Sequence, residues 1–215
     1  MIFSAKKLPS SSISKLYSKC LSDVKNFYNY SGSRYPKLFT VKTRKEMDFL
    51  YGEKTENWLV GFSNGDFIFT FSPEVYEKYS VHKYSKKEYE SLIKHEMSHF
   101  YYYLYANTDN PLWLNEGLAY CCADQVKDFS QPKKFSKLLK YYDTFSKDAY
   151  IESSHAVSLL IDKFGKKKVI QLIKSFKNKR LNDKTVFVEE FEKIYKSKPT
   201  YSFLNGLIKD FGEGL

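Results

Sequence analysis

Two histidines with a glutamate beside the first are the residues of this chain best suited to chemistry. They stand in the segment His95-Glu96-Met97-Ser98-His99. Residues four apart on a helix share one face, so both imidazoles can reach one metal ion at about 2.0–2.1 Å. Glu96 cannot easily ligate that ion beside its neighbour, but it can take a proton from a water at the metal. The pattern predicts a zinc site with Glu96 as general base.

Glu116 is the expected third ligand. Asn107, Thr108 and Asp109 interrupt the preceding helical pattern, and Asn110-Pro111 is typical of the N-cap and first residue of a new helix. Glu116 would then lie in the second turn of that helix. From there its carboxylate could project toward the two histidines and leave a fourth coordination position open. The alternative is an ordinary surface carboxylate.

The segment from Lys86 to Ala106 is expected to be the helix that carries both histidines. Ser85 can serve as its N-cap, and no proline or glycine interrupts it. Its apolar residues recur near helical spacing. These residues are Tyr89, Leu92, Ile93, Met97, Phe100 and Leu104.

Other zinc architectures that begin with the same five residues do not fit. The metzincin pattern requires a glycine and a further histidine at fixed places after the second histidine. Tyr102 and Tyr105 occupy those places. The inverted histidine and glutamate motif is also absent, which leaves the class in which a glutamate is the third ligand.

Three motifs together carry a resemblance to a known family. The first is His95 to His99, the second is Pro111 to Ala119 (PLWLNEGLA), and the third runs from Tyr150 to Gly165 with the pattern Tyr-x-x-small, an apolar run and glycine. They resemble the gluzincin metallopeptidases, and within them the peptidase-MA-like branch related to the aminopeptidase N family. The resemblance covers about Gly61 to Gly165.

The resemblance implies a role for each matched residue. His95, His99 and Glu116 would hold one Zn²⁺ ion, Glu96 would be the base and proton shuttle, and Tyr150 would donate to the oxyanion of a tetrahedral intermediate. It also implies a zinc metallopeptidase that acts on a peptide or protein substrate. The implied fold is zincin-like, with zinc in a cleft between two lobes.

The chain departs from the aminopeptidases where those enzymes bind the free amine of the substrate. Their Gly-x-Met-Glu-Asn segment is missing, and Trp58 to Phe71 stands in the corresponding region. This region predicts two apolar strands around an Asn64-Gly65 turn. An edge strand at Gly65 to Phe71, with Gly65, Phe67 and Phe69 as cleft residues, could bind an extended peptide; an ordinary core strand is the alternative. Whether cleavage is terminal or internal stays open.

Two further residues are weaker candidates. Some gluzincins place an aspartate four residues after the glutamate ligand, but Tyr120 occupies that position here. Asp124 is a candidate to orient an imidazole instead, with a solvated helix aspartate as the alternative. His155 could line the cleft and donate to the oxyanion, with a packing or capping role as the alternative.

The whole chain is expected to form one α+β domain. Its 215 residues, 42% hydrophobic and 18% aromatic, suffice for a full core. We expect an N-terminal α/β lobe with a small mixed sheet at about 1–84 and a mainly helical lobe at about 85–215. Outside the segments already described, the patterns predict a strand at Leu38–Lys42 and helices at Ser10–Tyr30, Lys45–Tyr51, Lys133–Thr144, Ser153–Phe164, Lys166–Phe176, Lys184–Tyr195 and Thr200–Phe211.

Charge and cysteine content limit the partners. The net charge of +10 comes mostly from lysines spread over helices, without a nucleic-acid motif, so no specific nucleic acid is expected. No apolar run approaches a membrane span, and three cysteines without paired spacing favour a reducing, cytoplasmic setting. A zinc-bearing binding protein without hydrolysis, or a basic nucleic-acid-associated protein, are the alternatives. The oligomeric state stays open.

Overall fold

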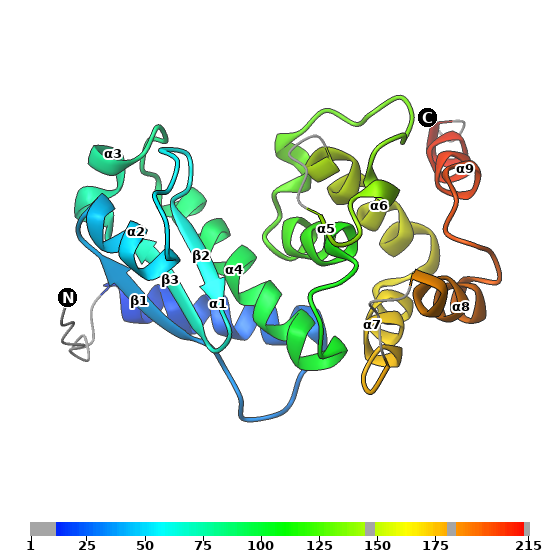
Figure 1. Cartoon of the computed structure of the whole chain (residues 1–215), viewed down its shortest axis with the longest axis horizontal. Helices are drawn as coiled ribbons and strands as arrows, with labels where there is room; N and C mark the ends of the chain where they lie inside the picture. The colour runs from blue at the N-terminus through cyan, green and yellow to red at the C-terminus, as the bar shows by residue number, and fades with distance from the viewer. Residues whose placement is uncertain (1–11, 145–148, 180–183, 213–215) are drawn as a thin grey trace. The chain divides into compact units, whose positions relative to one another are not determined.

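The computed structural model describes residues 12–144, 149–179 and 184–212 (Figure 1). These residues form an α+β fold that is mostly helical and contains one three-stranded sheet. The chain divides into two compact units, Met1–Met97 and Ser98–Leu215. The boundary falls inside the long helix α4 (Lys86–Ala106), which therefore contributes residues to both units.

The first unit combines the sheet with helices. Its elements before α4 are α1 (Ser12–Tyr28), β1 (Lys37–Val41), α2 (Arg44–Tyr51), β2 (Gly61–Asn64), β3 (Phe67–Phe71), the 3-10 turn η1 (Pro73–Val75) and α3 (Tyr76–Tyr79). The two helices predicted in this region, which are α1 and α2, and the predicted strand, which is β1, are confirmed, and their ends differ from the prediction by at most two residues. Residues 10 and 11 of the first predicted helix lie outside the described residues. Helix α1 is amphipathic, and it buries Leu16, Cys20, Val24 and Tyr28.

The sheet is mixed, as predicted. Its order is β1-β3-β2, with β1 parallel and β2 antiparallel to β3. Asn64 pairs with Phe67, so the two-residue turn consists of Gly65 and Asp66 rather than Asn64 and Gly65. Gly65 has φ +57, a conformation that glycine adopts without the steric cost of a Cβ.

The prediction that Gly65 to Phe71 forms an edge strand is wrong. Strand β3 is central, and both of its edges are already hydrogen-bonded, to β1 and to β2. A peptide cannot add to a strand whose backbone groups are all paired within the sheet. The edges of this sheet are β1 and β2.

The two faces of the sheet differ in burial. Ile68 and Thr70 point to a fully buried face. The opposite face carries a row of rings from cross-strand partners, because Phe39, Phe69 and Phe62 are aligned by the register, with centroids 5.6 and 5.0 Å apart. Such aligned pairs stabilise a sheet beyond its backbone hydrogen bonds.

The second unit is helical. After the end of α4 it contains α5 (Leu112–Cys122), the 3-10 turns η2 (Val126–Asp128) and η3 (Leu138–Lys140), α6 (Ala149–Phe164), α7 (Lys166–Ser175), α8 (Lys184–Tyr195) and α9 (Tyr201–Gly212). The predicted helices that became α7, α8 and α9 are confirmed within one residue. Helix α6 begins at Ala149, four residues before the predicted start at Ser153.

Gly117 lets α5 and α6 pack closely. A Cβ at this position would lie 2.5 Å from the backbone oxygen of Ser153 and would also collide with Val157. Only a residue without a side chain permits this approach. The contact fixes the helix of Glu116 against the helix of Tyr150.

The predicted helix from Lys133 to Thr144 is wrong. This segment is irregular apart from the short turn η3, because its backbone groups bond outside the segment. Phe135 donates its N–H to Asn205 Oδ1 at 2.6 Å, and Leu139 donates to the Tyr201 hydroxyl at 3.2 Å. Tertiary partners thus replace the intrahelical bonds that the apolar spacing suggested.

No helix within the described ranges is both long and apolar enough to cross a bilayer.

Candidate metal centre

Helix α4 presents the two histidines as predicted. Its N-terminus is capped by Ser85, whose hydroxyl oxygen accepts the N–H of Glu88 at 3.1 Å. Tyr89, Ile93 and Met97 are fully buried at spacings of four residues and anchor one face of the helix. His95 and His99 therefore lie together on an adjacent face, both half-buried.

Helix α5 brings Glu116 to the histidines. The helix begins at Leu112, with Pro111 in the N-cap position rather than Asn110, so the predicted start is shifted by one residue. Trp113 and Leu114 are buried and fix the first turn. Glu116 falls in the second turn, as predicted, and is half-buried.

The side chains of His95, His99 and Glu116 form one potential ligand group. One nitrogen or carboxylate oxygen from each lies within 4.8 Å of the other two. The distance between His99 Nε2 and Glu116 Oε1 is 3.7 Å. A tetrahedral zinc ion with bonds of about 2.1 Å separates its ligand atoms by about 3.4 Å. The His99 and Glu116 atoms are thus spaced to within a few tenths of an ångström of what one zinc ion requires.

Asn115 fixes the orientation of His99. Its Oδ1 lies 2.9 Å from His99 Nδ1, while its Nδ2 donates to the backbone oxygen of Asp109 at 3.3 Å. The amide oxygen is therefore the group that faces the imidazole, and it can only accept. In the neutral ring this contact favours the tautomer with the proton on Nδ1, which leaves the Nε2 lone pair for a metal ion.

Sequence reasoning missed Asn115. The signal was present, because an asparagine in the apolar segment Trp113-Leu114-Asn115 has to be either exposed or satisfied by a partner. Asn115 is only 4% exposed, so the second case holds.

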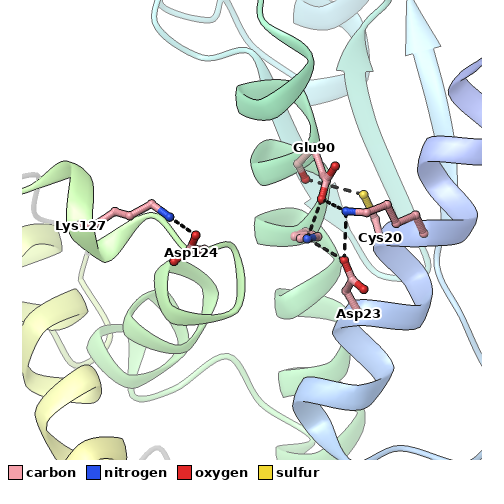
Figure 2. Close-up of polar contacts among 7 residues, drawn as sticks. Cys20, Asp23, Glu90, Asp124 and Lys127 are labelled. Carbon is pink, nitrogen blue, oxygen red and sulfur yellow. Dashed lines mark hydrogen bonds and ion pairs between the residues drawn. The ribbon is translucent and has the colours of Figure 1, made fainter.

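Asp124 does not take the orienting role. It lies beyond the end of α5, its side chain is 77% exposed, and it forms an ion pair with Lys127 (Figure 2). The solvated alternative is therefore correct.

Glu96 is buried on α4 at 7% exposure and does not belong to the ligand group. A general base must lie within hydrogen-bond reach of the proton that it removes. Its part in catalysis stays a prediction.

Tyr150 lies in a cluster of tyrosines near Glu116. Its ring packs edge-on against Tyr141 at 5.8 Å and Tyr120 at 6.1 Å between centroids. Burial raises the pKa of Tyr150, and the nearby charge of Glu116 raises it further. The phenol therefore keeps its proton and can donate a hydrogen bond close to the ligand group.

Sequence reasoning also missed Tyr141, which lay within the wrongly predicted helix. Burial and then the charge of Glu116 raise its pKa as well. No local pattern marks this tyrosine among the 19 of the chain.

The structure does not bring His155 into the ligand group. Its ring hydrogen-bonds the backbone of Phe129 and Ser130, and burial lowers its pKa. The other ring nitrogen, Nε2, is buried without a hydrogen-bond partner among the described residues. A neutral packing histidine is the interpretation that these contacts favour.

Gly65, Phe67 and Phe69 belong to the β2–β3 hairpin of the first unit. Gly65 is in the turn, and the two phenylalanines lie on the aromatic face of the sheet, where Phe67 is 40% exposed. Their role in substrate binding stays a prediction.

The chain was also compared with protein-family models, with curated proteins and with solved structures, and none of them matches it. The ligand group and its surroundings are accordingly the basis for inferring function.

Proposed function

We propose that this protein is a zinc-dependent peptidase. The observation that carries the proposal is the convergence of His95, His99 and Glu116, whose ligand atoms lie within 4.8 Å of one another. Two imidazoles and one carboxylate are the ligand set of catalytic zinc sites that keep a fourth position open.

Two further features of the chain support zinc at this site. His99 is already held in the tautomer that a metal ligand needs, through its contact with Asn115. Partial burial of all three ligands also fits a catalytic site, which must remain accessible to substrate.

The proposed reaction is hydrolysis of a peptide bond. A bound Zn²⁺ ion supplies Lewis-acid activation of water and of the scissile carbonyl. The Glu96 carboxylate removes one proton from the water as its oxygen bonds to the carbonyl carbon. The protonated Glu96 then returns this proton to the leaving amine as the C–N bond breaks. Tyr150 donates its O–H to the oxyanion that forms in between. The products are one carboxylic acid and one amine, which at neutral pH ionise to a carboxylate and an ammonium group.

Metal content tests the ligand set. Mass spectrometry of the native protein with Zn²⁺ should show one ion per chain. The variants His95→Ala, His99→Ala and Glu116→Ala should each lose it, whereas Glu96→Gln should retain it. Retention of zinc by all three ligand variants would contradict the proposed centre.

Cleavage of a diverse peptide library by zinc-loaded protein tests the reaction. Mass spectrometry should detect cuts that disappear in Glu96→Gln, and the position of the cuts would distinguish terminal from internal cleavage. If wild type and Glu96→Gln give the same products, the peptidase proposal fails. One retained zinc ion without cleavage would instead support the zinc-bearing binding protein, and salt-dependent binding of DNA or RNA would support the nucleic-acid alternative.

A further inference from the structure

We propose that Tyr141 is a positioning residue, which holds the phenol of Tyr150 beside Glu116. The inference rests on the proposed function, in which Tyr150 donates to the oxyanion. Tyr141 lies in the irregular segment before α6 and is only 2% exposed. Its ring meets that of Tyr150 edge-on, with an interplanar angle of 82° and 5.8 Å between centroids.

The backbone around Tyr141 is attached to the helix that carries Glu116. The first N–H groups of a helix have no partner within the helix. In α5, Trp113 donates to the carbonyl of Tyr141 at 3.0 Å, and Leu112 donates to the carbonyl of Tyr142 at 2.7 Å. The segment thus caps α5 one turn before Glu116.

The same segment is attached to the helix that carries Tyr150. The carboxylate of Glu152, two residues after Tyr150, accepts the backbone N–H of Ser136 at 2.9 Å, Lys137 at 2.7 Å and Leu138 at 2.9 Å. Glu152 is buried, so these charge-assisted bonds are shielded from water. Tyr141 is consequently fixed relative to both α5 and α6.

The side chains complete this connection. A hydrogen bond joins the two phenols. Tyr141 thereby fixes the direction of the Tyr150 hydroxyl. The hydroxyl can turn to a developing oxyanion, because a charged oxygen is a stronger acceptor than a phenol.

The test uses the full chain labelled with 3-fluorotyrosine and its ¹⁹F NMR spectrum. Loss of one resonance in Tyr150→Phe assigns Tyr150. We expect this resonance to shift in Tyr141→Phe and to stay in place in the control Tyr142→Phe, whose ring packs against Phe187. The reciprocal variant Tyr150→Phe should shift the resonance of Tyr141, so the result does not depend on the folding of one variant.

Kinetics supply the second measurement. In Tyr141→Phe we expect kcat to fall by about 10- to 100-fold, the range of a misplaced catalytic group, while KM and zinc content stay unchanged. An unmoved Tyr150 resonance, or a kcat equal to that of wild type, would overturn the role of Tyr141. A wild-type protein that cleaves no peptide would contradict the proposed function instead, while the NMR spectra still decide whether Tyr141 holds Tyr150.

Discussion

His99 Nδ1 lies 2.9 Å from Oδ1 of Asn115, the residue directly before Glu116. Helix α5 thus supplies a potential ligand and, from the neighbouring position, the group that orients a second ligand on α4. The amide of Asn115 is itself held by the backbone oxygen of Asp109 at 3.3 Å. Orientation of His99 therefore depends on a chain of two hydrogen bonds that is largely shielded from solvent.

Replacing Asn115 with leucine should weaken metal binding. The variant removes the acceptor for His99 Nδ1–H, and loss of such an outer partner typically lowers metal affinity by about 10- to 100-fold. Competition with a chromophoric chelator measures the zinc dissociation constant. Asn115→Asp is the matched control, since its carboxylate can still accept from His99 and should retain most of the affinity. Equal affinities of Asn115→Leu and wild type would contradict the orienting role.

Replacing Gly117 with alanine should destabilise the second unit. The new Cβ would lie 2.5 Å from the backbone oxygen of Ser153, so α5 and α6 would have to separate. Overpacking of this kind costs about 1–3 kcal/mol of unfolding free energy. Chemical denaturation of wild type and variant measures the difference.

Gly206 provides the control for that variant. It also lies in a helix, but a Cβ there would meet nothing within 4 Å. Gly206→Ala should stabilise the protein by up to about 1 kcal/mol through helix propensity. The same sign of change in both variants would argue against tight packing at Gly117.

An ion-pair network between α1 and α4 should make stability sensitive to acid (Figure 2). Lys94 Nζ lies 2.7 Å from Asp23 and 2.8 Å from Glu90, and Lys19 also pairs with Glu90. The hydrogen bond from Lys94 lowers the pKa of Asp23. Burial acts to raise the pKa of Glu90, but hydrogen bonds from Lys19 and Lys94 outweigh it and lower the pKa.

Carboxyl groups with lowered pKa stabilise the fold above their unfolded pKa of about 4, and this contribution is lost as the pH falls through the folded pKa. Glu90→Gln should reduce the unfolding free energy at pH 7 by up to about 1 kcal/mol and flatten its decline between about pH 5 and 3. Denaturation at a series of pH values tests this expectation. The exposed Glu53→Gln is the control, and a Glu90→Gln curve parallel to wild type would refute it.

His155 should produce a separate pH effect nearer to neutrality. Burial lowers its pKa, so the folded state favours the neutral ring. The stabilisation is complete above the unfolded pKa of about 6.5 and is lost progressively as the pH falls toward and through the folded pKa. His155→Asn keeps a donor for the backbone partners and should flatten the stability profile between about pH 7 and 5.

Denaturation in the presence of a chelator measures the His155 effect without competition between protons and metal at the other histidines. The exposed His82→Asn should leave the slope unchanged. If His155→Asn retains the slope of wild type, the ring is not held in its neutral form.

The sequence determined those features that depend on near neighbours in the chain. Helix α4 and the shared face of His95 and His99 follow from helical spacing and the Ser85 cap, and Glu116 follows from the start signal before α5. The β2–β3 hairpin was foreseeable from apolar runs and turn residues. In each case the hydrogen bonds that build the element join residues a few positions apart or across one short turn.

Tertiary structure decided the rest. Strand β3 is central because it pairs with β1 as well as with β2. The apolar residues of a strand do not indicate which other strand will pair with it. The 133–144 segment is irregular because Glu152, Asn205 and the N-terminus of α5 satisfy its backbone. Asn115 and Tyr141 likewise make hydrogen bonds to segments that are distant in the sequence, Asn115 to His99 and Tyr141 to the N-terminus of α5. Hydrogen bonds between distant segments override local propensity, since a buried polar group must find a partner wherever the fold supplies one.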